Sequence, residues 1–299
     1  MKNEKLRIKV LLAVFFVLVA ATAFGQANAG ISGAIEWDKM EINAAVSLDL
    51  ASAGIKLPAG RTQGEALIAS EYVRLIRSNI LNLQVDSSSV IADLVGRGEW
   101  TLWEAEHLAM QASSVPPALS PDLSSLSASY TLGLAGIVAA HLRHERPAEV
   151  PRTLSPITAR TYTGIVIIAS ESQPVHGMKS LALPRPCLFP KIWDTDMNLI
   201  FERNMLMPMA GTMVRYFPER EIFAGGPSGL SPEITAVVGE RPLRIFARGV
   251  FGISPTDPII SRDDALLIIS TAENRNLLRE GRIAIILDDS VLKSPLDSE

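Results

Sequence analysis

Residues 40–50 have the sequence MEINAAVSLDL, in which apolar side chains alternate with mostly polar ones over the whole segment. An extended chain places successive side chains on opposite faces, so this period of two predicts a half-buried strand. The apolar residues between 66 and 83 recur close to the period of an amphipathic helix, and residues 83–85 favour a further strand. Residues 35–95 are therefore predicted to form a small strand–helix–strand unit.

Two more helices are predicted in the first half of the chain, at residues 100–110 and 128–143, with a proline- and serine-rich joint between them. The next segment contains three prolines, each of which removes a backbone donor and resists regular structure: Pro147, Pro151 and Pro156. Residues 146–160 are therefore predicted to be a linker. It would separate an N-terminal α+β domain with a helical segment, residues 30–145, from a C-terminal α+β domain, residues 161–299.

The second half is rich in short apolar segments that predict strands. They cover residues 164–169, 192–194, 199–201, 213–216, 243–247 and 283–287. The second and third of these flank four turn-like residues and so predict a hairpin. Ser261 with Asp264 has the spacing of a helix N-cap, which places a helix before the last strand. Few regular βα alternations occur, which favours an α+β fold, with a mixed sheet and packed helices after the first unit, over a doubly wound sheet.

The N-terminus has the three-part pattern of a secretory signal peptide. Basic residues precede an uncharged apolar run over residues 10–24, and Ala27-Asn28-Ala29 offers a cleavage site before Gly30. A second cleavage site at residues 23–25 stays open, as does an uncleaved N-terminal anchor, although the run is shorter than the roughly 20 residues that span a bilayer. No Cys lies near the cleavage region, which excludes lipid attachment there. Residues 1–29 are thus predicted to be a signal peptide of an exported, periplasmic protein, with no transmembrane segment in the mature chain.

The charge balance excludes a general nucleic-acid binder. The 299 residues include 28 Lys and Arg against 32 Asp and Glu, a net charge of −4. The predicted signal peptide holds four of the basic residues and one acidic residue, so the mature chain has 24 against 31, a net charge of −7. No basic surplus exists to neutralise phosphates. The 47% hydrophobic content excludes a disordered chain.

Sequence motifs of catalysis are missing: the chain has no GxSxG elbow, Walker loop, HExxH, EF-hand loop or dinucleotide-binding GxGxxG. Cys187 is the single cysteine, so no internal disulfide can form, and it is predicted to be a packed structural thiol. His141 and His144 lie three residues apart, but further ligands for a metal are not apparent. The chain is predicted not to be an enzyme and to hold no cofactor, metal or catalytic residue.

Asp257, Asp263 and Asp264 concentrate carboxylates around one loop and one helix start. Helix capping accounts for them, and a cation or acid–base role is the alternative. With His176 they are the weak ligand candidates of a competing hypothesis, a periplasmic ligand-binding or hydrolytic protein that uses the acidic loop around residues 257–264. That hypothesis requires a concave pocket in which these carboxylates converge.

Seven motifs follow one another in the second half: TGIVIIA, PCLFPKIWD, LIF, PLRIFARGV, SPTD, SRDDA and RIAIILD. In order and spacing, residues 160–290 resemble a family of exported bacterial envelope proteins related to FlgP and FlgT, which build flagellum-associated outer-membrane rings and disks. Ile168 stands where the family strand has Asp, and Met197 where the hairpin has Gly. The lipid-bearing Cys of some relatives is missing.

The resemblance implies a non-enzymatic structural or assembly protein, associated with the envelope or the flagellum, that acts through protein–protein contacts. Its implied partners are envelope or flagellar basal-body proteins and further copies of itself in a homo-oligomer. The implied location is the periplasm, peripheral to the outer membrane.

Overall fold

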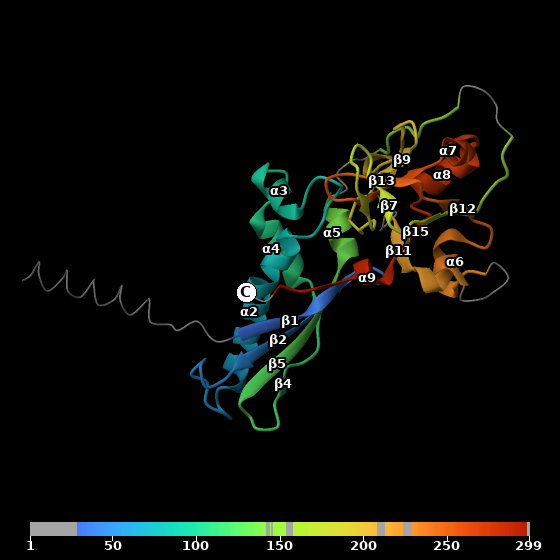
Figure 1. The fold of residues 1–299 in the computed structure, drawn as a ribbon. Helices are drawn as coiled ribbons and strands as arrows, with labels where there is room; N and C mark the ends of the chain where they lie inside the picture. Colours follow the sequence, from blue (N-terminus) through green and yellow to red (C-terminus); the bar gives the residue numbers. More distant parts are fainter. Residues whose placement is uncertain are drawn as a thin grey trace, which may run out of the picture.

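The structure is a computed structural model, and it describes residues 29–141, 144, 146–153, 158–207, 213–223 and 229–297. The predicted signal peptide, apart from its last residue Ala29, lies outside these residues, as do residues 154–157 of the predicted linker. Within the described part, the chain has an α+β fold made of two units that lie side by side (Figure 1). No described helix has both the length and the apolar character needed to cross a membrane.

The N-terminal unit is built on an antiparallel sheet with the strand order β16-β1-β2-β5-β3, and β4 also pairs with β5. Its three long strands are β1 (Ala29–Glu36), β2 (Glu41–Asp49) and β5 (Ser125–Gly133). The short ones are β3 (Ser113–Ser114), β4 (Ala118–Leu119) and β16 (Lys293–Pro295). The strand predicted over residues 40–50 is confirmed as β2, and its apolar side chains are buried under a helix.

That helix is α2 (Arg61–Leu81), and its existence agrees with the sequence pattern. The predicted buried stripe is confirmed at Ile76 and Ile80, but Ala66 and Ala69 are exposed while Ile68 and Leu75 are buried. Alanine fits either face of a helix, so these positions carried little information. No strand forms at residues 83–85, where Gln84 makes a single isolated bridge with Val90.

The helix predicted over residues 128–143 is wrong in its first part. Residues 125–133 form β5, which pairs with β2 along its whole length, and α5 (Leu134–His141) begins only after it. Ala128, Tyr130 and Leu132 are buried while the residues between them face outward, so the segment has the period of a strand. Two further helices, α3 (Ile91–Gly96) and α4 (Leu102–Met110), complete the unit.

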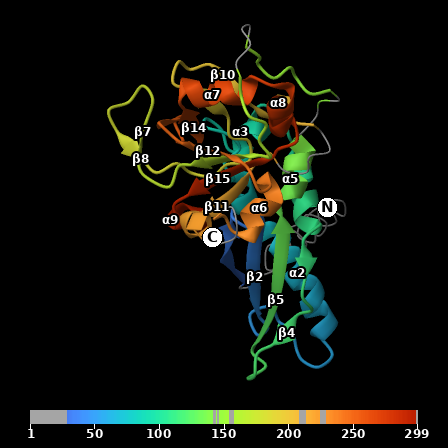
Figure 2. The same cartoon turned by 90° about the vertical axis from the view of Figure 1, so that its right-hand side faces the viewer.

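The C-terminal unit contains a parallel sheet with the strand order β11-β15-β6-β12. The strands are β6 (Ile165–Ile168), β11 (Arg215–Pro218), β12 (Leu243–Phe246) and β15 (Ile283–Leu287). Figures 1 and 2 show α6 (Pro232–Val238) on one side of the sheet and α7 (Arg262–Ile269) with α8 (Ala272–Arg279) on the other. Alternate side chains of β15 enter the two cores, so all five of its residues are buried.

A second, mixed sheet of the same unit has the order β10-β9-β14-β13. Its strands are β9 (Ile192–Asp194), β10 (Leu199–Phe201), β13 (Gly249–Phe251) and β14 (Asp257–Ile260). The predicted hairpin is confirmed as β9 and β10, and Met197 in its turn has a positive φ of 60°. The remaining elements are β7 (Gln173–Pro174), β8 (Leu181–Ala182), η1 (Arg203–Met205), η2 (Glu219–Phe223) and α9 (Asp289–Leu292).

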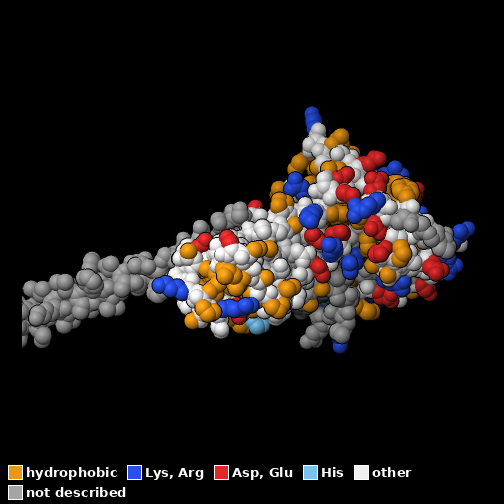
Figure 3. Space-filling model, turned by 90° about the horizontal axis from the view of Figure 1, so that it is seen from below, with side chains coloured by type: hydrophobic (Ala, Val, Ile, Leu, Met, Phe, Trp, Pro, Cys, Tyr) orange, Lys and Arg blue, Asp and Glu red, His pale blue; other side chains and the backbone are white. Residues whose placement is uncertain are grey.

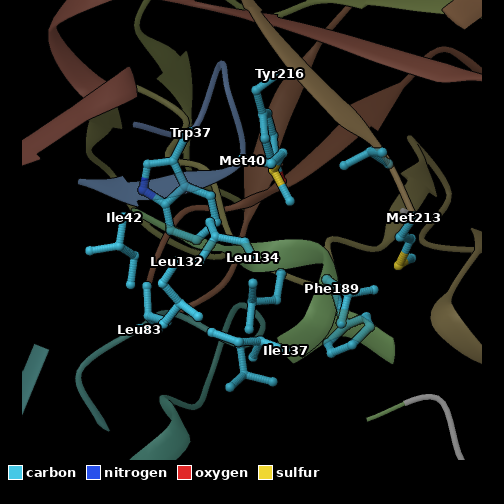
Figure 4. Packing of buried hydrophobic residues seen from close by; sticks show 14 of the residues in the cluster. Trp37, Met40, Ile42, Leu83, Leu132, Leu134, Ile137, Phe189, Met213 and Tyr216 are labelled. Atoms are coloured by element: carbon cyan, nitrogen blue, oxygen red, sulfur yellow. The ribbon is translucent and has the colours of Figure 1, made fainter. Parts of the chain in front are cut away.

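The two units share one hydrophobic core. Figure 4 shows Trp37 and Ile42 of the N-terminal unit packed in one cluster with Phe189 and Tyr216 of the C-terminal unit. The rings of Trp37 and Tyr216 meet edge to face with 6.1 Å between their centroids. The C-terminal segment also returns to the first sheet, where β16 pairs with β1. The division of the chain at residues 146–160 stays a prediction.

Candidate functional site

Asp257, the first residue of β14, lies in the interior and is 0% exposed. Its carboxylate accepts hydrogen bonds from the Lys191 backbone N–H (3.1 Å), the Thr256 hydroxyl (3.1 Å) and the Trp193 indole N–H (3.4 Å). The Ser87 hydroxyl is a further donor. Burial raises the pKa of Asp257 above its usual value, although these hydrogen bonds act in the opposite direction. A side chain so enclosed can position loops but cannot meet a ligand from solvent.

The other two acidic candidates lie at the start of α7 and do not join Asp257. The Ser261 hydroxyl accepts a hydrogen bond from the Asp264 backbone N–H (3.1 Å) and donates one to the Asp264 carboxylate (2.6 Å). Asp263 is exposed. Capping therefore accounts for Asp264, but it was the wrong interpretation for Asp257. Among the described residues, no hydrogen bond links the three carboxylates.

Asp257 belongs to a polar joint between the two units, which we define as residues 84–89 and the loops that contact them. Backbone carbonyls of Gln84 and Val85 accept hydrogen bonds from the N–H groups of Leu188 and Phe189, at 3.0 and 2.8 Å. The Ser87 carbonyl accepts one from the Ser254 N–H (3.0 Å). Because both units contribute backbone groups, the joint fixes the units against each other.

The conformation of residues 84–89 is held by Asp86. One of its carboxylate oxygens accepts hydrogen bonds from the backbone N–H groups of Ser88 and Ser89, both at 2.9 Å, and from their hydroxyls. Burial raises the pKa of Asp86, but the hydrogen bonds outweigh it and hold the pKa below the usual value. The charged form of Asp86 thus stabilises the joint.

Cys187 is buried beside the joint, as predicted for a structural thiol. The Tyr216 hydroxyl accepts a hydrogen bond from the Cys187 N–H (3.1 Å) and donates one to the Cys187 carbonyl (2.9 Å). Burial raises the pKa of the Cys187 thiol, which disfavours the reactive thiolate. Nothing in the sequence pointed to Tyr216, because its partner is 29 residues away in the chain.

The remaining predicted site residues lie apart from the joint. His176 is exposed, and its ring tilts against Phe251 with 6.1 Å between the centroids. Ala27 lies outside the described residues, whereas Ala29 and Gly30 begin β1 opposite Leu48 and Ser47. Cleavage before Gly30 would leave the first sheet short of one strand residue, and this cleavage stays a prediction.

Helix α4 presents large apolar side chains to solvent. Trp103 is 65% exposed and Met110 is 61% exposed. Trp103, His107 and Met110 occupy positions i, i+4 and i+7 and therefore lie on one face of the helix. We call these three residues the α4 stripe. The Trp103 and His107 rings stack with 5.1 Å between centroids and 13° between planes. The exposure of Trp103 excludes a position in the core.

The backbone under the α4 stripe is fixed at its first turn. The Thr101 hydroxyl accepts a hydrogen bond from the Glu104 N–H (3.2 Å), and the Glu104 carboxylate accepts one from the Thr101 N–H (2.7 Å). This is a complete capping box. Glu106, on the side of α4, forms an ion pair with Arg77 of α2. These contacts fix the start of the helix and tie it to α2.

A crevice of about 500 Å³ lies at the carboxyl ends of the parallel strands β6 and β12. Its polar lining includes Ser170, Glu171, Glu219 and Arg248. Ser170 is 6% exposed, whereas the other three side chains are exposed. Ligands of open α/β sheets bind at this edge. In the described part of the chain, no three His, Cys, Asp or Glu side chains are arranged to hold a metal ion.

Comparison with known proteins identifies two similar domains. Residues 28–140 match the family model of the N-terminal domain of Treponema pallidum Tp0624, and residues 164–289 match that of the second domain of the same protein. Each match covers less than half of this chain, and the matches follow the order of the two domains. No curated protein matches the chain. The resemblance to the FlgP- and FlgT-related family stays a prediction, because neither model bears on it.

Proposed function

We propose that this chain is a non-enzymatic structural or assembly protein of the periplasm, associated with the envelope or the flagellum, that acts through protein–protein contacts. The α4 stripe is the observation that carries the proposal. Single exposed apolar residues are common, but a helix face with an exposed Trp and an exposed Met is typical of contact surfaces. Tryptophan is also among the residues that contribute most to binding energy.

The partners proposed here are envelope or flagellar basal-body proteins and further copies of the chain. The proposed location is the periplasm, peripheral to the outer membrane. The support for both is the signal-peptide pattern before Gly30 and the resemblance of residues 160–290 to exported envelope proteins.

Affinity purification from the native envelope tests this function. The tagged wild-type chain is compared with Trp103→Ala/Met110→Ala and with a matched control, Leu181→Ala/Ile253→Ala, which removes two exposed apolar side chains of the C-terminal unit. We expect the α4 variant to lose envelope partners and the control to retain them. Equal recovery of partners by all three proteins would show that α4 is not the contact surface.

A second candidate function, ligand binding, is supported at the crevice rather than at residues 257–264. Ser170 contributes a hydroxyl-bearing side chain to the lining, which also carries the Arg248 guanidinium and the Glu171 and Glu219 carboxylates. This combination suits a small zwitterion. Titration with L-lysine up to about 10 mM, followed by the amide shifts of residues 168–173 and 246–248, tests it. Shifts that persist in Arg248→Ala would assign the binding to another place.

A further inference from the structure

We propose that the α4 stripe is covered by a second copy of this chain, with the α4 helices antiparallel across a two-fold axis. The inference rests on the proposed function, since it names one partner of the same surface. It follows from three properties of the stripe: its charge, its symmetry and its area.

The stripe is a neutral surface on an acidic protein. The mature chain has a net charge of −7, so two copies repel each other unless they meet where unpaired carboxylates are absent. Both acidic residues of α4 are engaged, Glu104 in the capping box and Glu106 with Arg77. Figure 3 shows the same contrast on a larger scale, since charged side chains gather over the C-terminal unit while the N-terminal unit shows mostly apolar and uncharged polar ones.

The stripe is self-complementary under two-fold symmetry. When two α4 helices run antiparallel about a point between Glu106 and His107, Trp103 of each copy faces Met110 of the other. A methionine sulfur against an aromatic ring is a favourable contact. A two-fold interface uses the same patch twice, so the stripe supplies both halves of the contact.

The exposed area fits a weak dimer. Leu102, the helix residue before Trp103, is 46% exposed and extends the apolar surface beside the stripe. The exposed surface of Trp103, Met110 and Leu102 together amounts to about 400 Å² per copy. Two copies together approach the lower limit of about 1,200 Å² for a specific interface once polar rim residues are added. We therefore expect an association that is reversible and depends on concentration.

Sedimentation velocity of residues 30–299 over a concentration series tests the proposal. We expect a monomer–dimer equilibrium, with a shift of tryptophan emission to shorter wavelength as the dimer forms, because Trp103 is exposed whereas Trp37 and Trp100 are buried. Trp103→Glu should weaken association at least tenfold. Leu181→Glu, a charge at a side chain that is 68% exposed on β8, is the matched control and should leave it unchanged.

Cross-linking tests the geometry independently of the Glu variants. His107→Cys lies beside the axis and should form an intermolecular disulfide, whereas Leu123→Cys, exposed in the turn before β5, should not. The native Cys187 is buried. A dimer that Leu181→Glu disrupts and Trp103→Glu does not would overturn the proposal. A chain that stays monomeric at every concentration would also overturn it. If Trp103→Ala/Met110→Ala still loses envelope partners in that case, the proposed function stands, and the partner at α4 is another protein.

Discussion

Replacing Asp257 by Ala tests whether this carboxylate joins the two units or serves a ligand. Asp257 is fully buried, and its donors come from the joint loop (Ser87), from the segment before β9 (Lys191) and from β9 itself (Trp193). If the side chain is structural, its loss should destabilise the fold. If it serves a ligand, stability should change little and binding should suffer.

The expected magnitude follows from the donors left behind. Each buried donor without an acceptor costs about 1–3 kcal/mol, and removing a buried charge recovers part of its desolvation cost. We therefore expect Asp257→Ala to lower the free energy of unfolding by about 2–4 kcal/mol. Asp257→Asn keeps one acceptor oxygen and should cost about half as much.

Urea denaturation followed by circular dichroism measures both variants, with Asp263→Ala as the matched control. Asp263 is six residues away and exposed, so its loss should leave the midpoint unchanged. A cost of Asp263→Ala equal to that of Asp257→Ala would refute the assignment of the joint. So would an Asp257→Ala variant as stable as the wild type.

The pH dependence of the Asp257→Asn variant gives an independent check. Burial raises the folded-state pKa of Asp257, so the folded state favours the protonated acid. Protonation of Asp257 therefore contributes fully to the free energy of unfolding of the wild type below the unfolded-state pKa of about 3.9. This contribution is lost as the pH rises through the folded-state pKa. Asparagine has no such dependence. The difference in unfolding free energy between wild type and Asp257→Asn should therefore be larger at pH 4 than at pH 7, and the reverse order would contradict a raised pKa.

Three further predictions concern the same joint. Tyr216→Phe should lower the free energy of unfolding by about 2–4 kcal/mol, measured by urea denaturation, because the N–H and carbonyl of Cys187 both lose a buried partner. Asp86→Asn should be destabilising at pH 7, with a difference that shrinks as pH falls through the lowered folded pKa, which thermal unfolding between pH 7 and pH 3 would show. Gly252→Ala should lower the melting temperature more than Gly54→Ala: both have positive φ, but the new Cβ would meet atoms at 2.3 Å only at position 252.

The sequence predicted those helices and strands whose pattern is contained in one short segment of the chain. The alternation of residues 40–50 and the Ser261–Asp264 cap are both contained in one segment, and the structure confirms both. The segment of β5 was mistaken for a helix because its buried set includes alanine and its partner β2 lies about 80 residues away. Strand pairing over such a distance is not encoded in a local period.

The candidate site was harder to predict, because exposure depends on what covers a residue. Helix α4 is apolar on most sides, and its burial against α2 decides that Ala105 and Leu108 face the core while Trp103 faces solvent. Asp257 was grouped with Asp263 because they are close in sequence. Asp257 begins strand β14, all of whose residues are buried, whereas Asp263 lies in the first turn of α7. Proximity along the chain therefore gave the wrong partners for Asp257. Apart from Thr256, its donors Ser87, Lys191 and Trp193 are at least 64 residues away.

The joint also bears on how an assembly could use this chain. The α4 stripe belongs to the N-terminal unit and the crevice to the C-terminal unit, and the two units share one core, a polar joint and the β1–β16 pair. Movement of one unit against the other would break backbone hydrogen bonds and expose buried apolar surface, both of which are costly. A contact at α4 therefore fixes the direction in which the C-terminal unit faces.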